Sequence, residues 1–212
     1  MPDSLATARE DVAIANRILA NEGLLDAFGH VSMRHPAMPE RFLISRHRAP
    51  ELVQPPDIVE LNLDGEPAVP TSFRLYGERI IHAAIYAARP DVMAICHHHA
   101  PSVLPYAIAR VELKPVYHLG ALMGPKVPYW DSHDEFGDTA LVVVTPEEGR
   151  SLAKALGPYW MILMGRHGAT VAGASLREMV DITAPCLSRR ICRSASHPRR
   201  RLAHARQPRL TP

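Results

Sequence analysis

The most apolar stretch in the middle of the chain ends in three consecutive histidines, His97, His98 and His99. The preceding run, residues 92–96, predicts a buried β-strand. Since side chains alternate between the two faces of a strand, we expect His97 and His99 to point one way and His98 the other. Two imidazoles on one face at the end of a buried strand form half of a metal site. The alternative interpretation of a His-x-His pair is a solvated strand end.

Two further residues extend this candidate site. His167 follows another apolar run about seventy residues later, and Glu78 lies on a predicted helix before the histidine-bearing strand. The whole set of three imidazoles and one carboxylate disfavours a solvated strand end. Three neutral imidazoles leave open positions on a divalent ion, which can then act as a Lewis acid on a substrate oxygen. A nearby carboxylic acid can move one proton, so both aldol cleavage and decarboxylation are compatible with the set.

The composition indicates one globular domain with a sizeable core, since 47% of the 212 residues are apolar. The three cysteines have neither zinc-ligand spacing nor the pattern of a disulfide framework. No apolar stretch approaches the length of a membrane span, and charged residues occupy the place of a signal-peptide core. We therefore expect a cytoplasmic protein without a membrane partner.

Charge divides the chain into two parts. The first 184 residues carry 16 basic and 22 acidic side chains, a net charge of −6, whereas residues 185–212 contain eight arginines and no acid. Nothing in the acidic part suggests nucleic-acid binding. The basic tail has few large apolar side chains, which predicts disorder. It is either a basic arm for an acidic partner or an end without selected function. We thus expect a domain at 1–184 and a separate tail at 185–212.

Periodicity and capping signals predict helices and strands that interleave along the domain. Helices are expected over residues 5–22, 75–88 and 146–156, and again after the capping signal at Ser175. Strands are expected over residues 28–34, 41–45, 58–63, 92–96, 141–144 and 161–164. This order of elements favours a layered α/β/α domain.

Several motifs in this order resemble the class II aldolase/adducin family, over about residues 8–184. They are Gly29-His30-Val31-Ser32-x-Arg34, Glu78, His97-x-His99, Arg166-His167-Gly168 and Val171-x-Gly173. The resemblance implies an α/β fold, a three-layer α/β/α sandwich with a mostly antiparallel central sheet. It implies that His97, His99 and His167 bind a divalent metal ion and that Glu78 is the acid/base. It also implies a homotetramer with sites between subunits.

The anion-binding loops indicate a branch of this family. Sugar-phosphate aldolases of the family carry a Thr/Ser-Gly loop and a Ser-Ser pair, whereas this chain has Ser45-Arg46-His47-Arg48 and no Ser-Ser pair beside Glu78. Guanidinium groups suit planar carboxylates, although a solvated pair of loop arginines is the alternative. The pattern resembles the decarboxylases of hydroxylated aromatic dicarboxylates, such as 3-hydroxy-2-methylpyridine-4,5-dicarboxylate and dihydroxyphthalate.

We therefore expect a metal-dependent lyase that decarboxylates an aromatic ortho-hydroxy carboxylate, a small-molecule partner. The metal would be Mn²⁺ or Zn²⁺, with Fe²⁺ or Co²⁺ as further candidates. Glu78 and His118 are the predicted catalytic residues. The predicted substrate-binding residues are His30, Ser32, Ser45, Arg46, His47 and Arg48. The alternatives are an aldolase that cleaves a hydroxy-keto acid or sugar phosphate, and a non-catalytic adducin-like scaffold.

Overall fold

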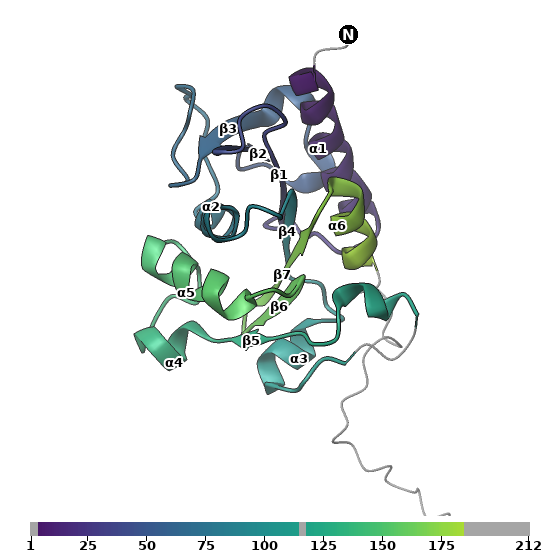
Figure 1. Cartoon of the computed structure of the whole chain (residues 1–212), viewed down its shortest axis with the longest axis vertical. Coiled ribbons are helices and arrows are strands. Elements are labelled where there is room, and N and C mark those ends of the chain that lie inside the picture. Colours follow the sequence, from purple (N-terminus) through teal and green to yellow (C-terminus); the bar gives the residue numbers. More distant parts are fainter. Residues whose placement is uncertain (1–3, 115–117, 185–212) are drawn as a thin grey trace, which may run out of the picture.

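The computed structural model describes residues 4–114 and 118–184 (Figure 1). Its elements, in chain order, are α1 (Ser4–Asn21), β1 (His30–Arg34), β2 (Arg41–Ser45), η1 (Pro50–Leu52), η2 (Pro55–Asp57), β3 (Ile58–Asn62), α2 (Arg79–Ala88), β4 (Ala94–His98), α3 (Leu104–Ala109), η3 (Gly120–Met123), β5 (Tyr129–Trp130), α4 (Ser132–Phe136), α5 (Pro146–Leu156), β6 (Met161–Met164), β7 (Gly168–Gly173) and α6 (Leu176–Thr183). The short helices η1 to η3 are 3₁₀ helices. The predicted disordered tail lies outside the described residues.

One seven-stranded sheet organises the described chain, in the order β3-β2-β1-β4-β7-β6-β5. All neighbouring strands are antiparallel except β5 and β6. The strand that carries the histidines, β4, lies in the middle of the sheet between β1 and β7. All five of its residues are buried, because helices cover both faces of the sheet.

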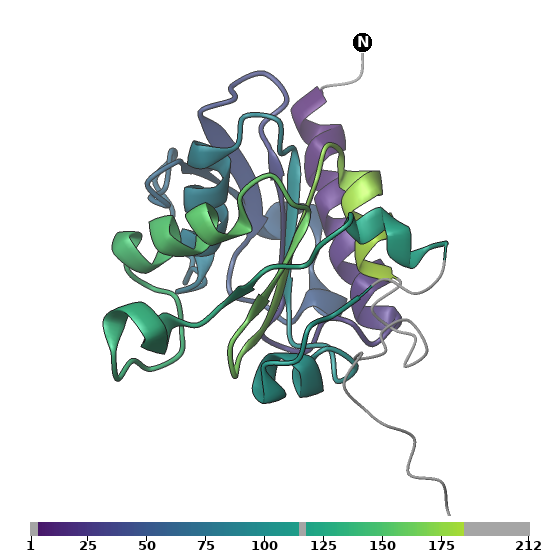
Figure 2. The ribbon, with the colours of Figure 1, turned by 60° about the horizontal axis from the view of Figure 1, so that its bottom comes forward.

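Helices on both faces give the predicted three-layer α/β/α sandwich, with α1 and α6 on one side and α2 and α5 on the other (Figures 1 and 2). Cys96 of β4 packs into the core beneath α1 and α6. Its neighbour Ile95 packs into the core beneath α2 and α5. By the same alternation, His97 shares the face of Ile95, and His98 points to the opposite face.

The helix predicted from residue 75 begins only at Arg79, and Glu78 is its N-cap residue. The residues before it are held as a loop by contacts with the segment after β2. The carbonyl of Arg74 accepts a hydrogen bond from the N–H of His47 at 2.8 Å, and the hydroxyl of Tyr76 donates to the carbonyl of Arg48. These bonds compete with helix formation and leave Glu78 at the start of α2.

The predicted strand at residues 141–144 is wrong. Leu141 has a left-handed backbone, with φ of 62°, and two of the three following valines are exposed. The backbone groups of this segment bond to side chains instead of to another strand. Val143 donates its N–H to Glu78 at 3.2 Å, and the carbonyl of Leu141 is hydrogen-bonded to Nδ1 of His167.

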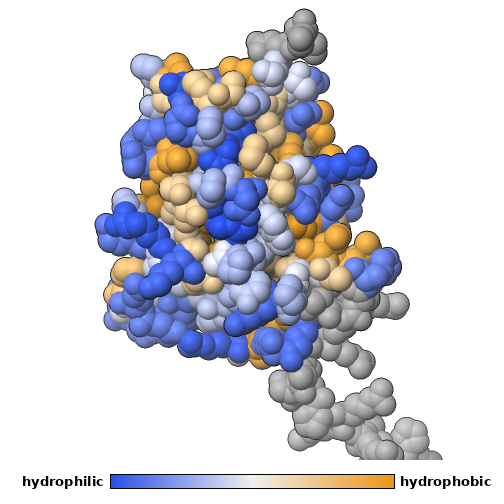
Figure 3. All heavy atoms as spheres, viewed as in Figure 1, coloured by the Kyte–Doolittle hydropathy of each residue, from blue (hydrophilic) through white to orange (hydrophobic). Residues whose placement is uncertain are grey.

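Some large apolar side chains are exposed on the side formed by α1, α6 and η3 (Figure 3). Ile14 and Ile18 on α1 are 37% and 45% exposed, and Leu119 and Leu122 beside α6 are both 44% exposed. Within the described residues, no helix has both the length and the apolar character that a membrane span requires.

Candidate metal centre

Glu78, His97, His99 and His167 come together at one end of the central strands. One ligand atom of each residue lies within 4.8 Å of those of the other three. Nε2 of His99 lies 3.0 Å from Nε2 of His97 and 3.1 Å from Nε2 of His167. The two carboxylate oxygens of Glu78 lie 3.5 Å and 3.4 Å from Nε2 of His97 and His167, respectively. The structure thus brings together the four residues that the sequence set apart as one site.

A close approach of two strands places His167 beside the other histidines. His97 belongs to β4, His99 follows the end of β4, and His167 lies in the turn between β6 and β7. A Cβ atom at Gly168 would lie 2.4 Å from the carbonyl oxygen of His98 and 2.9 Å from the ring of His99. Only glycine therefore allows β7 to begin so close to the end of β4.

The second ring nitrogens of His99 and His167 are held by hydrogen-bond acceptors. Nδ1 of His99 lies 3.0 Å from Oδ2 of Asp26, and Nδ1 of His167 is bonded to the carbonyl oxygen of Leu141. A carboxylate or a carbonyl accepts a proton from Nδ1 and thereby fixes the tautomer. In both neutral rings the lone pair is then on Nε2, which faces the cluster.

His97 has the same tautomer because of Thr170. Its Nδ1 lies 3.1 Å from Oγ1 of Thr170, and that hydroxyl donates its own proton to Sδ of Met164 at 3.3 Å. With that proton directed at the sulfur, Oγ1 is free to accept from Nδ1–H of His97. All three Nε2 lone pairs therefore point to one centre.

This donor set fits a divalent metal ion. Three lone pairs and a carboxylate that face one another repel, and a cation among them removes the repulsion. Tetrahedral Zn–N bonds of about 2.0–2.1 Å would put ligand atoms about 3.3 Å apart. Four of the contacts, at 3.0–3.5 Å, are close to that spacing, and the whole set lies within 4.8 Å. Imidazole and carboxylate ligands also suit Mn²⁺, Fe²⁺ and Co²⁺.

Burial and Glu78 set the charges of the cluster. Burial, with smaller effects of His167 and His99, lowers the pKa of His97 well below its ordinary value, so this ring is neutral. Burial also disfavours the charged form of His167, but the hydrogen bond and the charge of Glu78 outweigh it and raise the pKa of His167. The carboxylate of Glu78 thus supplies the negative charge that attracts a cation to this point.

Arg46 and Arg48, predicted to bind a carboxylate, both pair with the buried Asp57. Nε of Arg46 and Nη1 of Arg48 lie 2.7 Å and 3.1 Å from the same oxygen, Oδ1. Burial opposes ionisation of Asp57, but the bonds from Arg46 and from the N–H of Gln54 lower its pKa overall. Because a buried carboxylate holds both arginines, they are not simply a solvated pair of loop side chains. The two arginines and Asp57 together carry a formal charge of +1.

A row of aromatic rings connects this loop with the metal cluster. The ring centroids of His47 and Tyr76 are 5.0 Å apart, and those of Tyr76 and His30 are 4.5 Å apart. The centroid of His30 is in turn 5.3 Å from that of His97. The predicted substrate-binding residues His30 and His47 therefore belong to one row of rings that ends at the cluster, in which His30 is 1% exposed.

The other predicted site residues lie outside the cluster. Ser32 is fully buried, and its hydroxyl contacts His82 and Tyr86. Ser45 is 1% exposed, and among the described residues its hydroxyl has no hydrogen-bond partner. His118 is exposed in the turn before η3 and is not a member of the four-residue cluster. Neither serine presents its hydroxyl to solvent. A catalytic role of His118 stays a prediction.

Three residues of the site were not anticipated: Asp26, Thr170 and Asp57. Asp26 also accepts the N–H groups of Phe28 and Gly29, and an Asp just before a glycine-led strand is a recognisable turn signal. Thr170 lies opposite His97 in the pairing of β4 with β7. The sequence alone does not predict this pairing, because it depends on the order of the strands in the sheet.

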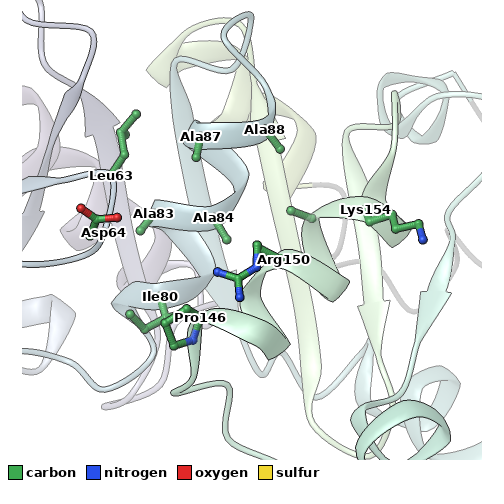
Figure 4. Close-up of a pocket in the computed structure, with 11 residues that line it drawn as sticks. Leu63, Asp64, Ile80, Ala83, Ala84, Ala87, Ala88, Pro146, Arg150 and Lys154 are labelled. Atoms are coloured by element: carbon green, nitrogen blue, oxygen red, sulfur yellow. The ribbon is translucent and has the colours of Figure 1, made fainter.

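A separate cavity of about 430 Å³ lies between α2 and α5 (Figure 4). Alanines of α2, among them Ala83 and Ala87, form much of its lining, and Arg150 and Lys154 line it from α5. None of the four cluster residues lines this cavity, so it is not part of the candidate metal centre.

Comparisons with known proteins identify relatives of similar sequence. Decarboxylase tropJ of Talaromyces stipitatus is 35% identical over 176 residues, which cover 77% of this chain and 66% of that protein. A 3,4-dihydroxyphthalate decarboxylase of Arthrobacter keyseri is 29% identical over 189 residues, which cover 84% of this chain and 74% of the relative. The chain thus spans slightly less than two thirds of tropJ and about three quarters of the second relative.

Solved structures show the same fold. An aldolase II superfamily protein from Pseudomonas syringae superposes with a TM-score of 0.71 at 22% identity, over 86% of this chain and 71% of that one. The family model described as "Class II Aldolase and Adducin N-terminal domain" matches residues 10–186, a range that includes every residue of the cluster. The chain therefore belongs to the class II aldolase and adducin family.

Proposed function

We propose that this chain is a divalent-metal-dependent carbon–carbon lyase that decarboxylates an aromatic ortho-hydroxy carboxylate. The observation that carries the proposal is the convergence of three imidazole Nε2 atoms and the Glu78 carboxylate within 4.8 Å. The similarity to two proteins named as decarboxylases supports this reaction over other reactions of the family. A non-catalytic scaffold would not need such a set of ligands.

His97, His99 and His167 would hold the metal ion through Nε2, and their Nδ1 partners keep the rings in position. When bound, the ion would act as a Lewis acid toward a ring oxygen and the neighbouring carboxylate of the substrate. The bond between the ring carbon and the carboxylate then breaks, and the electron pair stays on the ring. Carbon dioxide leaves, and Glu78, which has first taken the proton of the substrate's ring hydroxyl, gives that proton to the ring carbon from Oε2, since Oε1 is held by the N–H of Val143.

The charged loop after β2 is suited to a second carboxylate of the substrate. Arg46 and Arg48 exceed the charge of Asp57 by one, and their side chains are 31% and 33% exposed. The guanidinium of Arg46 also lies over the ring of Phe73, 5.1 Å from its centroid. An aromatic dicarboxylate could then span from this loop, along His47 and His30, to the metal ion.

The proposal includes assembly as a homotetramer, for which the exposed apolar side chains beside α1, α6 and η3 offer a contact surface. Burial of such side chains between subunits would remove them from water. Sedimentation velocity of the purified full chain measures the assembly directly.

The test of function uses purified full-length protein, first for metal content and then for product. The chain is incubated with Mn²⁺ or Zn²⁺ and 3,4-dihydroxyphthalate, followed by other aromatic hydroxy acids. We expect about one equivalent of metal per chain and release of carbon dioxide. The variant His99→Gln should lose both, whereas His133→Gln, which changes an exposed histidine outside the cluster, should lose neither.

Other outcomes contradict parts of the proposal. Release of an aldehyde from a hydroxy-keto acid or sugar phosphate, without carbon dioxide from any aromatic acid, would indicate an aldolase. Absence of bound metal under both conditions would indicate the adducin-like scaffold.

A further inference from the structure

A chain of hydrogen bonds runs from His30 through the buried interior to α2. Nδ1 of His30 lies 2.7 Å from Nε2 of His82, and Nδ1 of His82 lies 2.6 Å from Oγ of Ser32. Oγ of Ser32 lies 2.8 Å from the hydroxyl of Tyr86. All four side chains are at most 1% exposed, so water cannot replace any of these partners.

Two ring residues of this hydrogen-bond chain, His82 and Tyr86, are neutral. Burial lowers the pKa of His82 to about 3 and raises the pKa of Tyr86 above its ordinary value. His82, Ser32 and Tyr86 therefore each have one proton to donate, and three hydrogen bonds connect them with His30.

The position of Tyr86 determines the direction of these bonds. Among the described residues, its hydroxyl has a single hydrogen-bond partner, Ser32. If Ser32 donated to Tyr86, the phenolic proton would be buried without an acceptor, which is costly. Tyr86 therefore donates to Ser32, and the hydroxyl proton of Ser32 goes to Nδ1 of His82.

The same logic continues to His30. Because Nδ1 of His82 accepts, the proton of that ring is on Nε2 and is donated to Nδ1 of His30. The proton of His30 is then on its own Nε2, at the far edge of the ring from His82.

We infer that Tyr86, Ser32 and His82 are positioning residues that fix His30 as an Nε2–H donor for a substrate oxygen at the metal centre. The inference rests on the proposed function in its last step, the donation to substrate. Ser32, which we expected to bind substrate, would act through His82 instead.

The position of His30 agrees with this role. His30 lies opposite His97 in the pairing of β1 with β4, and their ring centroids are 5.3 Å apart. An oxygen atom held beside His97 is therefore close to the ring of His30. A neutral imidazole that donates to a developing oxyanion stabilises it without giving up its proton, as preorganised donors do in other enzymes.

The first test determines the tautomer of His30 in the full chain loaded with Zn²⁺. Protein labelled with [¹⁵N]histidine is studied by long-range ¹H–¹⁵N correlation spectra, and the variant His30→Asn identifies the signals of His30. We expect a protonated Nε2 and an unprotonated Nδ1. A proton on Nδ1 of His30 would overturn the inference, whether or not the chain is a decarboxylase.

The second test interrupts the hydrogen-bond chain at Tyr86, the end that lies farthest from His30. Tyr86→Phe removes one hydroxyl, and Ser32→Ala serves the same purpose if the first variant does not fold. We expect the Nδ1–H tautomer of His30 to appear in either variant, and kcat for the decarboxylated substrate to fall about 2- to 10-fold with little change of KM. Thr183→Val deletes another buried hydroxyl, which donates to the carbonyl of Met179, and should change neither quantity.

The two readouts separate the possible failures. An unchanged tautomer in both Tyr86→Phe and Ser32→Ala would show that these residues do not position His30. A changed tautomer with unchanged kcat would show that His30 does not donate to the reacting oxygen. If the wild-type chain releases no carbon dioxide from any acid, the proposed function fails, and the spectra still decide the tautomer.

Discussion

Oε1 of Glu78 accepts a hydrogen bond from the backbone N–H of Val143 at 3.2 Å. The bond connects Glu78, the N-cap residue of α2, with the segment that leads into α5. The other carboxylate oxygen, Oε2, lies 3.5 Å from Nε2 of His97. A backbone N–H is a permanent donor, so Oε1 stays an acceptor in either protonation state of Glu78. The proton that Glu78 carries is therefore directed to Oε2.

Glu78→Gln should keep this geometry and remove the titrating proton. The amide oxygen can accept from Val143 as Oε1 does, so we expect nearly normal metal content. Turnover should fall about 10²- to 10⁴-fold, the usual contribution of a general acid or base. Metal analysis and steady-state release of carbon dioxide measure the two effects, and Glu147→Gln on the exposed start of α5 is the matched control. Unchanged turnover would remove Glu78 from the mechanism.

Arg48→Ala should weaken binding of a dicarboxylate far more than of its monocarboxylate analogue. The substitution leaves Arg46 paired with Asp57, and the formal charge of the group falls from +1 to zero. A lost charge-assisted hydrogen bond costs about 1.5–3 kcal/mol, and only the dicarboxylate has that bond to lose. Values of KM for both substrates are compared with those of Arg150→Ala, an exposed arginine of α5. Equal effects on both substrates would mean that Arg48 does not bind the second carboxylate.

Asp57 should make the domain's stability depend on pH. The pKa of this carboxyl is lower in the folded chain than in the unfolded one, so its stabilising effect is complete above the unfolded value of about 3.9. The effect is lost as the pH falls through the folded pKa. Asp57→Asn should therefore lower the free energy of unfolding at pH 7 by about 1.5–3 kcal/mol.

Urea unfolding of the wild type and of Asp57→Asn at several pH values checks this expectation. The difference should be constant between pH 7 and pH 5 and should shrink below about pH 4. Asp138→Asn changes a fully exposed carboxylate and should give no such difference. A gap that widens toward low pH would contradict the assigned direction of the pKa shift.

Much of the fold can be predicted from the sequence because its signals are local. The capping box at Thr145 and the glycine at 157 bound α5 where the pattern predicts it, and the alternation along β4 separates His97 from His98. The segment at 141–144 has the composition of a strand, but its backbone bonds to Glu78 and His167. Only the folded chain brings those two side chains to it.

The candidate site shows the same division. The three imidazoles and Glu78 can be identified from residue type and spacing, since metal-ligand chemistry limits the choice. The groups that orient these side chains cannot be identified in that way. Thr170 becomes a partner of His97 only through the pairing of β4 with β7, and Asp57 meets Arg46 through the 3₁₀ turn η2.

Thr170 allows a test of how orientation affects metal binding. Thr170→Val keeps the shape of the side chain and removes the oxygen that accepts from Nδ1 of His97. The ring then has an unpaired buried N–H, and its tautomer is no longer fixed. Loss of such an outer partner typically lowers metal affinity about 10- to 100-fold. Competition with a chromophoric Zn²⁺ chelator measures the affinity of the full chain.

Thr170→Ser is the matched control, because it keeps the hydroxyl and loses only a methyl group. We expect its Zn²⁺ affinity to stay within about threefold of the wild type, well short of the loss expected for an outer partner. Melting temperatures of both variants, measured without metal, show whether either change weakens the core. Equal affinities of the valine and serine variants, at similar Tm, would mean that the Thr170 hydroxyl does not orient His97. A selective loss in the valine variant would instead assign the tautomer of His97 to one hydrogen bond, whose donor direction is fixed by the contact of Thr170 with Met164.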